Sequence, residues 1–407
     1  MIKNIYNLLE LKLKRKLWIL LLLTFASTAF ELLSVGLIIP AISFLVESDI
    51  YEKYPQLVPV LNFLGNPSQK YIVSFGMVFL AFIYLLKSSF LTYFVFWQNR
   101  FANEFQVRTA ERLFTKYIKQ PYTFHLQNNS AKLIRNINNE VMSVYSSLQS
   151  VLNFFMEIFV VTAFAFFLIY IEPIGSLIIL FFGFLIAFGY SKFAKTIVNS
   201  WGAKKVWHLG KSTQSLMEGI GGAKDVKLLG RESQFIKKFN YHNKKFANLN
   251  RINTSIAMLP RVWLEFVAII GLTIIVGSII IQDKDFGLIL PTVAVFGIAS
   301  FRLLPSVTKI LNAIQNIKYN EASVDIIFKD LQLEYSEISY EITEKINVKK
   351  ITIKTLTFHY PSFSENALNN ISVELNKGKS LGIIGESGSG KSTLVDIILG
   401  LLTPTDG

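Results

Sequence analysis

The sequence predicts an all-α membrane domain of six long transmembrane helices, followed by an incomplete α/β P-loop domain. Apolar blocks such as residues 154–171 and 177–190 carry almost no charge, although a soluble helix needs one polar face. Lys and Arg gather in the segments between these blocks. A phosphate-loop motif stands near residue 390. These three observations together predict the fold class.

The apolar blocks provide six segments of the roughly 20 residues that a helix needs to cross a hydrocarbon core. We expect the spans near residues 17–46, 71–98, 141–171, 173–194, 252–281 and 287–315. The first block is too long for a cleaved signal peptide and lacks a small-residue cleavage site.

The charges between the spans predict the orientation. Residues 195–251 hold twelve basic and three acidic residues, and residues 99–140 are also rich in Lys and Arg. The turns at residues 172–173 and 283–285 are short and acidic. Because basic loops stay in the cytoplasm, we expect both termini and both long loops to be cytoplasmic in a bacterial inner-membrane protein.

The two long loops have the composition of helices. Chain reversals are expected at Pro121 and at Gly219, Gly221 and Gly222, where helix-breaking residues stand. Twenty-odd helical residues would carry the spans about 30 Å below the membrane.

The formal net charge of +13 suits a nucleic-acid-binding protein as well as a membrane protein. No nucleic acid is expected as a partner, since no aromatic–basic module is visible. The sequence has no cysteine, which excludes disulfide bonds. It has only four histidines, so we do not expect a metal-binding site.

The composition changes after residue 330. Alternating segments at 348–354 and 371–375 predict half-buried strands of a soluble domain. We therefore predict a membrane domain over 1–330, a linker over 331–347 and a second domain over 348–407.

Residues 385–392, Gly-Glu-Ser-Gly-Ser-Gly-Lys-Ser, fit the phosphate-loop pattern G-x-x-x-x-G-K-[ST]. Glycines let backbone N–H groups turn toward phosphate oxygens, Lys391 reaches the β- and γ-phosphates, and Ser392 offers a hydroxyl to Mg²⁺. A strand at 380–384 and a helix at 392–402 are expected around the loop. The predicted ATP-binding residues are Gly385, Glu386, Ser387, Gly388, Ser389, Gly390, Lys391, Ser392 and Thr393.

Tyr360 lies in an aromatic segment, residues 357–361, that ends a predicted strand before a proline. Its ring could stack on adenine, and simple packing is the alternative interpretation.

Six spans, two basic loops and then this motif together resemble an ABC exporter whose transmembrane domain is fused to its nucleotide-binding domain, and the resemblance covers the whole chain. It implies that Tyr360 is the adenine-stacking aromatic, and that residues 121–129 and 216–232 hold the helices that couple to the nucleotide-binding domains. It also implies a type I exporter fold and a homodimer with intertwined spans that clamps two ATP molecules.

Within that family, residues 34–40, 260–265 and 301–306 most resemble PglK-type lipid-linked oligosaccharide flippases. A short external helix at 54–64 would suit that group. An exporter of another lipid, a peptide or a drug is the close alternative. A regulatory membrane P-loop protein or an inert fragment is the alternative from another class.

The chain departs from the family at its end, because the sequence shows no signature motif, second acidic motif or switch histidine before Gly407. We expect a C-terminally truncated product that binds nucleotide weakly and does not hydrolyse it alone.

Three basic residues lie in or near the apolar spans: Lys87, Arg261 and Arg302. Intramembrane charge is costly and usually faces a cavity or a partner. One hypothesis is that the three line a cavity and pair with a lipid diphosphate, which suits arginine geometry. The equal alternative is structural pairing with Glu31 or Glu157, or with Glu265 at i,i+4 from Arg261.

Overall fold

The computed structural model describes residues 1–37, 68–171, 173–281, 289–334, 348–360 and 365–407. The chain divides into two compact units: residues 1–113 with 134–331, and residues 114–133 with 332–407. The predicted external helix at 54–64 and most of the predicted linker lie outside the described residues.

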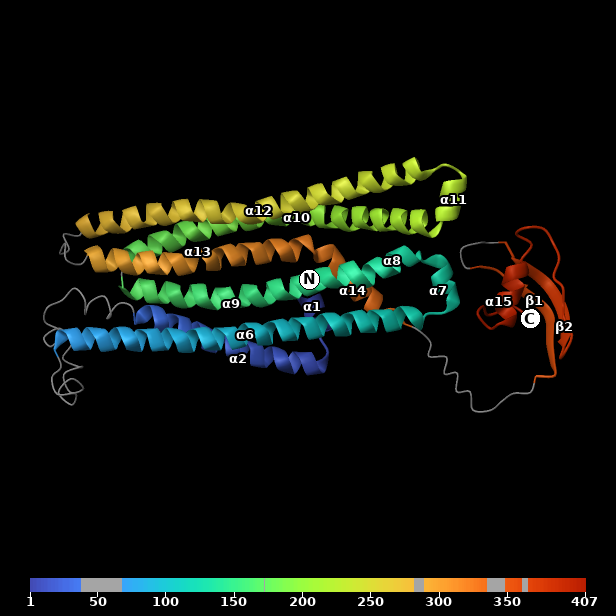
Figure 1. The fold of residues 1–407 in the computed structure, drawn as a ribbon, viewed down its shortest axis with the longest axis horizontal. Coiled ribbons are helices and arrows are strands. Elements are labelled where there is room, and N and C mark those ends of the chain that lie inside the picture. The colour runs from blue at the N-terminus through green and yellow to red at the C-terminus, as the bar shows by residue number, and fades with distance from the viewer. Residues whose placement is uncertain (38–67, 172, 282–288, 335–347, 361–364) are drawn as a thin grey trace. The chain divides into compact units, whose positions relative to one another are not determined.

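The elements follow one another along the chain as Figure 1 labels them. The helices before the sheet are α1 (Ile2–Leu8), α2 (Leu11–Gly36), α6 (Gln69–Ile118), α7 (Tyr122–Gln127), α8 (Ser130–Arg135), the π-helical turn η2 (Asn136–Glu140), α9 (Val141–Ile171), α10 (Pro173–Gly221), α11 (Ala223–Leu228), α12 (Glu232–Ile281), α13 (Ile289–Tyr319) and α14 (Glu321–Leu331). Strands β1 (Lys350–Phe358) and β2 (Leu368–Asn376) and helix α15 (Lys391–Ile398) follow.

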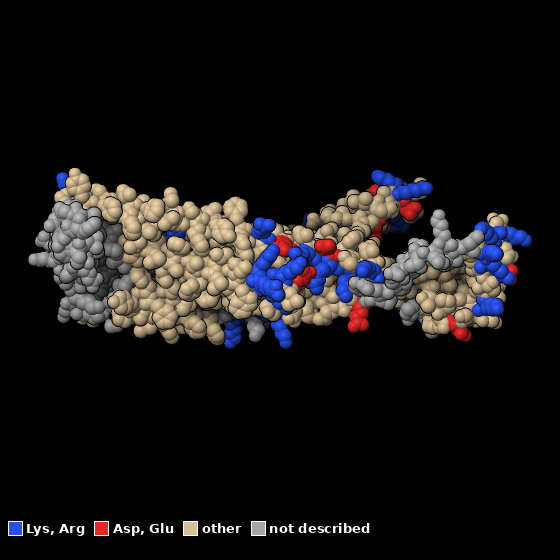
Figure 2. All heavy atoms as spheres, turned by 90° about the horizontal axis from the view of Figure 1, so that it is seen from below, with Lys and Arg blue, Asp and Glu red and all other residues tan. Residues whose placement is uncertain are grey.

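The six predicted spans fall in α2, α6, α9, α10, α12 and α13. Within the described residues, four segments are long and apolar enough to cross a membrane by length and composition: Leu11–Ser34, Lys70–Ile118, Ser130–Tyr170 and Glu232–Ile274. The first predicted span starts earlier than expected, because the helix already begins at Leu11. Figure 2 shows a long stretch of surface with very little charge beside a band rich in Lys and Arg, as the charge pattern of the sequence predicts.

The predicted helical loops are confirmed. Helices α6, α10 and α12 contain 50, 49 and 50 residues, or about 75 Å each at the α-helical rise. The chain reverses where helix breakers were noted: α6 ends at Ile118 shortly before Pro121, and α10 ends at Gly221. Helices α10 and α12 then run side by side as a long hairpin (Figure 1).

Two glycines on α10 allow close packing within the first unit. A Cβ atom at Gly202 would lie 2.1 Å from the backbone oxygen of Tyr319, and one at Gly210 would lie 2.2 Å from Arg135 Nη1. Gly202 depends on glycine because its neighbour is backbone, whereas the neighbour of Gly210 is the end of the Arg135 side chain.

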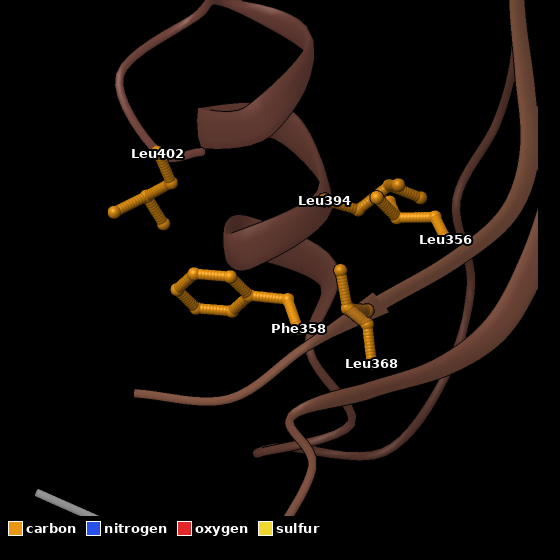
Figure 3. Packing of buried hydrophobic residues seen from close by; sticks show 5 residues of the cluster. All are labelled: Leu356, Phe358, Leu368, Leu394 and Leu402. Atoms are coloured by element: carbon orange, nitrogen blue, oxygen red, sulfur yellow. The ribbon is translucent and has the colours of Figure 1, made fainter. Parts of the chain in front are cut away.

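In the second unit, β1 and β2 pair antiparallel, with Lys350 opposite Asn376 and Phe358 opposite Leu368. Helix α15 packs on this pair through an apolar cluster (Figure 3). The cluster consists of Leu356, Phe358, Leu368, Leu394 and Leu402.

Two expectations for this unit were wrong. The predicted strand at 380–384 is not formed, because a strand needs a hydrogen-bonded neighbour and no described segment pairs with it. Helix α15 ends at Ile398 instead of Leu402, because Gly400 adopts a positive φ of 73° that terminates the helix.

A histidine pair joins the two helices of the long hairpin. His208 Nδ1 of α10 and His242 Nδ1 of α12 share a hydrogen bond of 3.1 Å, which requires one ring nitrogen to carry no proton. Burial lowers the pKa of both imidazoles, and nearby lysines lower it further.

We predict that acid weakens this hairpin. Because the pKa of both groups is lower in the folded protein than the usual 6.5, the unfolded chain binds more protons between those values. Stability is therefore fully present above pH 6.5 and falls as the pH drops toward the folded pKa. Melting temperatures at neutral and acidic pH should differ less in His208→Gln than in the parent; an equal difference would contradict this assignment.

We predict that Gly202→Ala destabilises the first unit. The added methyl would lie 2.1 Å from the backbone oxygen of Tyr319, and overpacking costs about 1–3 kcal/mol. Gly189→Ala in the same helix is the matched control, because nothing lies within 4 Å of its Cβ position. Thermal unfolding in detergent should show a lower melting temperature for Gly202→Ala only.

Candidate functional site

The loop that precedes α15 is shaped by glycine. Gly388 and Gly390 have φ values of 86° and 84°, a left-handed conformation that costs other residues about 1–2 kcal/mol. Successive residues in such conformations can turn backbone N–H groups toward an anion. The positive φ values of Gly388 and Gly390 are therefore compatible with the predicted phosphate loop.

Two of the glycines also allow close approach. A Cβ at Gly390 would lie 2.5 Å from the backbone oxygen of Ala367, at the start of β2, and one at Gly385 would lie 2.8 Å from Ser389 Oγ. The loop is thus packed against the sheet and against itself, while Glu386 and Ser387 are exposed.

Lys391 is curled over the loop. Its ammonium group donates hydrogen bonds to the backbone oxygens of Gly385 (2.9 Å) and Glu386, and to Ser389 Oγ (3.4 Å). These partners are neutral oxygens, and the anionic oxygens of a phosphate would bind the same ammonium group more strongly. Exposed Ser392 follows in the first turn of α15, where a hydroxyl can reach Mg²⁺ beside bound phosphate and the helix dipole favours an anion. The residues present therefore fit MgATP.

Tyr360 lies beside this helix. Its hydroxyl shares a hydrogen bond of 3.0 Å with Thr393 Oγ1, and its ring meets Phe358 edge-on at 5.0 Å between centroids. The structure thus brings Tyr360 together with the phosphate-loop helix, although the two stand about thirty residues apart in the sequence. Tyr360 therefore packs against Phe358, and stacking of its ring on adenine stays a prediction.

The predicted intramembrane residues have separate local partners. Lys87 donates to Ser34 Oγ at 2.8 Å and lies 5.0 Å from the centre of the Tyr84 ring. Arg261 pairs with Glu265 at 3.0 Å, as their spacing predicts, on side chains that are 77% and 57% exposed. The side chain of Arg302 lies outside the described part of the structure.

Sequence reasoning missed one partner of Glu157, Lys309. Lys309 of α13 donates to the fully buried Glu157 of α9 at 2.6 Å, while the lysine side chain stays 52% exposed. The sequence could have indicated this pair, because Lys309 is a charged residue within the predicted span 287–315 and such residues usually have an oppositely charged partner.

The tip of the α10–α12 hairpin carries an apolar hollow of about 310 Å³. Its lining includes Leu216, Ile220, Val226, Phe235 and Phe239. Part of its lining belongs to the segment, residues 216–232, that resembles a coupling loop, and most of the rest comes from the first turns of α12.

Comparison with protein-family models identifies an ABC transporter transmembrane region over residues 17–303 and an ABC transporter domain over residues 368–407. An ATP-dependent lipid A-core flippase of Yersinia pestis is 21% identical over 308 residues, which are 73% of this chain and 51% of the relative. The corresponding flippase of Pseudoalteromonas translucida is 25% identical, over 71% and 50% of the two chains. The chain thus spans about half the length of these curated relatives.

The phosphate-loop region is similar to a shorter protein as well. The energy-coupling factor transporter ATP-binding protein EcfA1 of Mycoplasma mobile is 45% identical over 65 residues, or 16% of this chain and 24% of that protein. Among solved structures, a bacterial Atm1-family ABC exporter with ATP bound matches with a TM-score of 0.71 at 15% identity, over 97% of this chain and 67% of that one. The last similarity supports the fold alone.

We predict that Gly390→Ala impairs nucleotide binding. Both the positive φ and the 2.5 Å approach to Ala367 exclude a methyl group, so the loop must rearrange and MgATP affinity should fall at least about tenfold, the equivalent of 1.4 kcal/mol. Gly382→Ala is the control, since nothing lies within 4 Å of its Cβ position. Fluorescent-nucleotide titration of the full-length protein measures both; equal affinities would contradict the assigned loop geometry.

Proposed function

Because the chain belongs to the ABC transporters, we propose that its full-length protein is an ATP-driven exporter that flips a lipid across the bacterial inner membrane. The observation that carries this proposal is the presence, in one chain, of a phosphate loop with the required backbone and a bundle of long apolar helices. The exporter fold of the helical unit favours outward movement of cargo over uptake.

The proposed mechanism begins at the second unit. ATP binds across the phosphate loop, with Lys391 on its phosphates, Ser392 on Mg²⁺ and Tyr360 against adenine. A homodimer would bring two such sites together, and the resulting movement would reach the membrane helices through α7 and the hollow at the α10–α12 tip. We assign residues 1–330 to the membrane domain, 331–347 to the linker and 348–407 to the nucleotide-binding domain, with both termini in the cytoplasm.

The proposed cargo is a lipid-linked oligosaccharide. Relatives named lipid A-core flippases support a large anionic glycolipid, and Lys87, Arg261 and Arg302 supply cations that suit a diphosphate. Lys309 of α13 adds a further basic side chain, which is half-exposed and pairs with Glu157. An exporter of another lipid, a peptide or a drug would keep the same nucleotide site and would have no need of cations for a diphosphate.

A regulatory P-loop membrane protein is the proposal's rival from another class. It would bind ATP through the same loop without coupling hydrolysis to a lipid. Reconstitution of the full-length protein in liposomes separates the two, because only an exporter hydrolyses ATP faster when its cargo is present. Lipid-linked oligosaccharide, lipid A-type glycolipid and peptide, added separately, then rank the candidate cargoes.

We predict that Lys391→Ala abolishes ATP-dependent flipping. Loss of a positioned charge that stabilises a transferring phosphoryl group lowers the rate about 10²- to 10³-fold. Phosphate release and lipid translocation should fall together, with the melting temperature unchanged. Continued ATP-dependent translocation by this variant would place the energy source elsewhere.

We predict that Arg302→Leu removes cargo-stimulated hydrolysis and leaves basal hydrolysis and folding intact. A cavity arginine contacts the diphosphate only when cargo is bound. Arg261→Leu is an informative comparison, because Arg261 already pairs with Glu265 at 3.0 Å. An unfolded Arg302→Leu protein would support structural ion pairing instead.

A further inference from the structure

The chain passes between its two compact units at three points: residues 113/114, 133/134 and 331/332. A polar cluster in the first unit, with three buried and two partly buried members, lies beside two of these crossings. We name it the joint cluster, and it consists of Arg135, Asn136, Glu140, Lys205 and Asp330. If the second unit moves, the chain segments at 133/134 and 331/332 move with it. The joint cluster contains the first residues of the first unit that such a movement would displace.

A hydrogen bond ties the two crossings together. Asn136, three residues after the second crossing, donates from Nδ2 to Asp330 Oδ2 at 2.9 Å, one residue before the third crossing. Asn136 is completely buried, and it also accepts from Arg135 Nη2 at 2.8 Å. The second loop crossing and the exit toward the linker are therefore held at a fixed separation within the first unit.

A π-helical turn supports the arrangement. Arg135 Nε lies 3.3 Å from Glu140 Oε1, and both residues are buried. In an α-helix, the side chains of residues five apart point about 140° away from each other. In η2 the turn is wider, because the Val141 N–H donates to the backbone oxygen of Asn136. The wider turn brings Arg135 and Glu140 to the same side of the helix. Such turns are rare and recur at functional sites.

Helix α10 closes the cluster. Arg135 Nη1 donates to the backbone oxygen of Val206 at 3.5 Å, beside the close approach to Gly210. Lys205 donates to Asn320 Oδ1 at 3.0 Å, at the turn between α13 and α14, and to Ser143 Oγ at 3.2 Å. Burial lowers the pKa of Lys205, and the Glu140 carboxylate opposes that shift. The start of α9, the middle of α10 and the α13–α14 turn thus meet at one place.

We propose that the joint cluster passes movement of the second unit to the membrane helices, and that Asp330, Arg135 and Glu140 are positioning residues for this coupling. The proposal rests on the proposed function, since only a transporter has movement to pass. It goes beyond the expected coupling segments, residues 121–129 and 216–232, because it assigns transmission of movement to a cluster inside the first unit. A cluster that merely stabilises the fold would affect melting and leave the response to cargo unchanged.

The first test compares two aspartates of α14. Asp330 accepts from Asn136, and Asp325 accepts from Asn4 of α1 at 3.0 Å, so each makes one Asn–Asp bond, but only Asp330 ties the two crossings. In the full-length protein, Asp330→Ala should keep basal ATP hydrolysis and lose most of the increase in hydrolysis that cargo produces in the parent, because coupling is a free energy separate from the energy of the nucleotide site itself. Asp325→Ala should keep both.

A second variant guards against a folding defect. Arg135→Met with Glu140→Leu replaces the buried pair by apolar side chains of similar size, a change that is often neutral for stability. We expect a melting temperature near that of the parent together with lost cargo stimulation. Normal stimulation in this folded variant would overturn the proposal.

The remaining outcomes are also decisive. Equal stimulation in Asp330→Ala and Asp325→Ala, with a cargo-responsive parent, overturns the joint cluster alone. A parent that hydrolyses ATP without any response to lipid overturns the proposed function and the joint cluster with it.

Discussion

A hydrocarbon interior offers no hydrogen-bond partner to a peptide group, and this constraint governs most of the structure. Each unsatisfied group would cost several kcal/mol, so an apolar segment in lipid must bond within itself as a helix. Helices α6, α10 and α12 continue this arrangement beyond the length that a membrane requires. The hydrogen bonds of a continuous helix resist sharp bending, so a displacement at one end reaches the other; α12 also contains Pro260, a position at which a helix can kink.

Charge follows different rules along these helices. Where a pair is exposed, as for Arg261 and Glu265, water and mobility reduce its value to about 0–1 kcal/mol. Where it is buried, as for Arg135 and Glu140, loss of one partner costs about 3–5 kcal/mol. Buried pairs therefore fix the geometry at particular places, and the joint cluster is such a place outside the predicted spans.

The nucleotide loop depends on backbone conformation instead of burial. Gly388 and Gly390 are required by their positive φ, and the close approach of Ala367 adds a steric requirement at Gly390. Local rules of this kind can be recognised in a string of eight residues. The strand expected at 380–384 could not be judged in the same way, because a strand forms only when another segment supplies its hydrogen bonds.

The sequence alone determined the helical membrane domain, the reversals at Pro121 and near Gly221, and the phosphate loop, because hydropathy, helix breakers and glycine act over short stretches of chain. Only the tertiary structure decided that Tyr360 meets Thr393, that Glu157 pairs with Lys309, and that Asn136 reaches Asp330 across nearly two hundred residues. Such contacts depend on how separate helices pack, and side-chain spacing along one helix carries no information about which residue of another helix will face it.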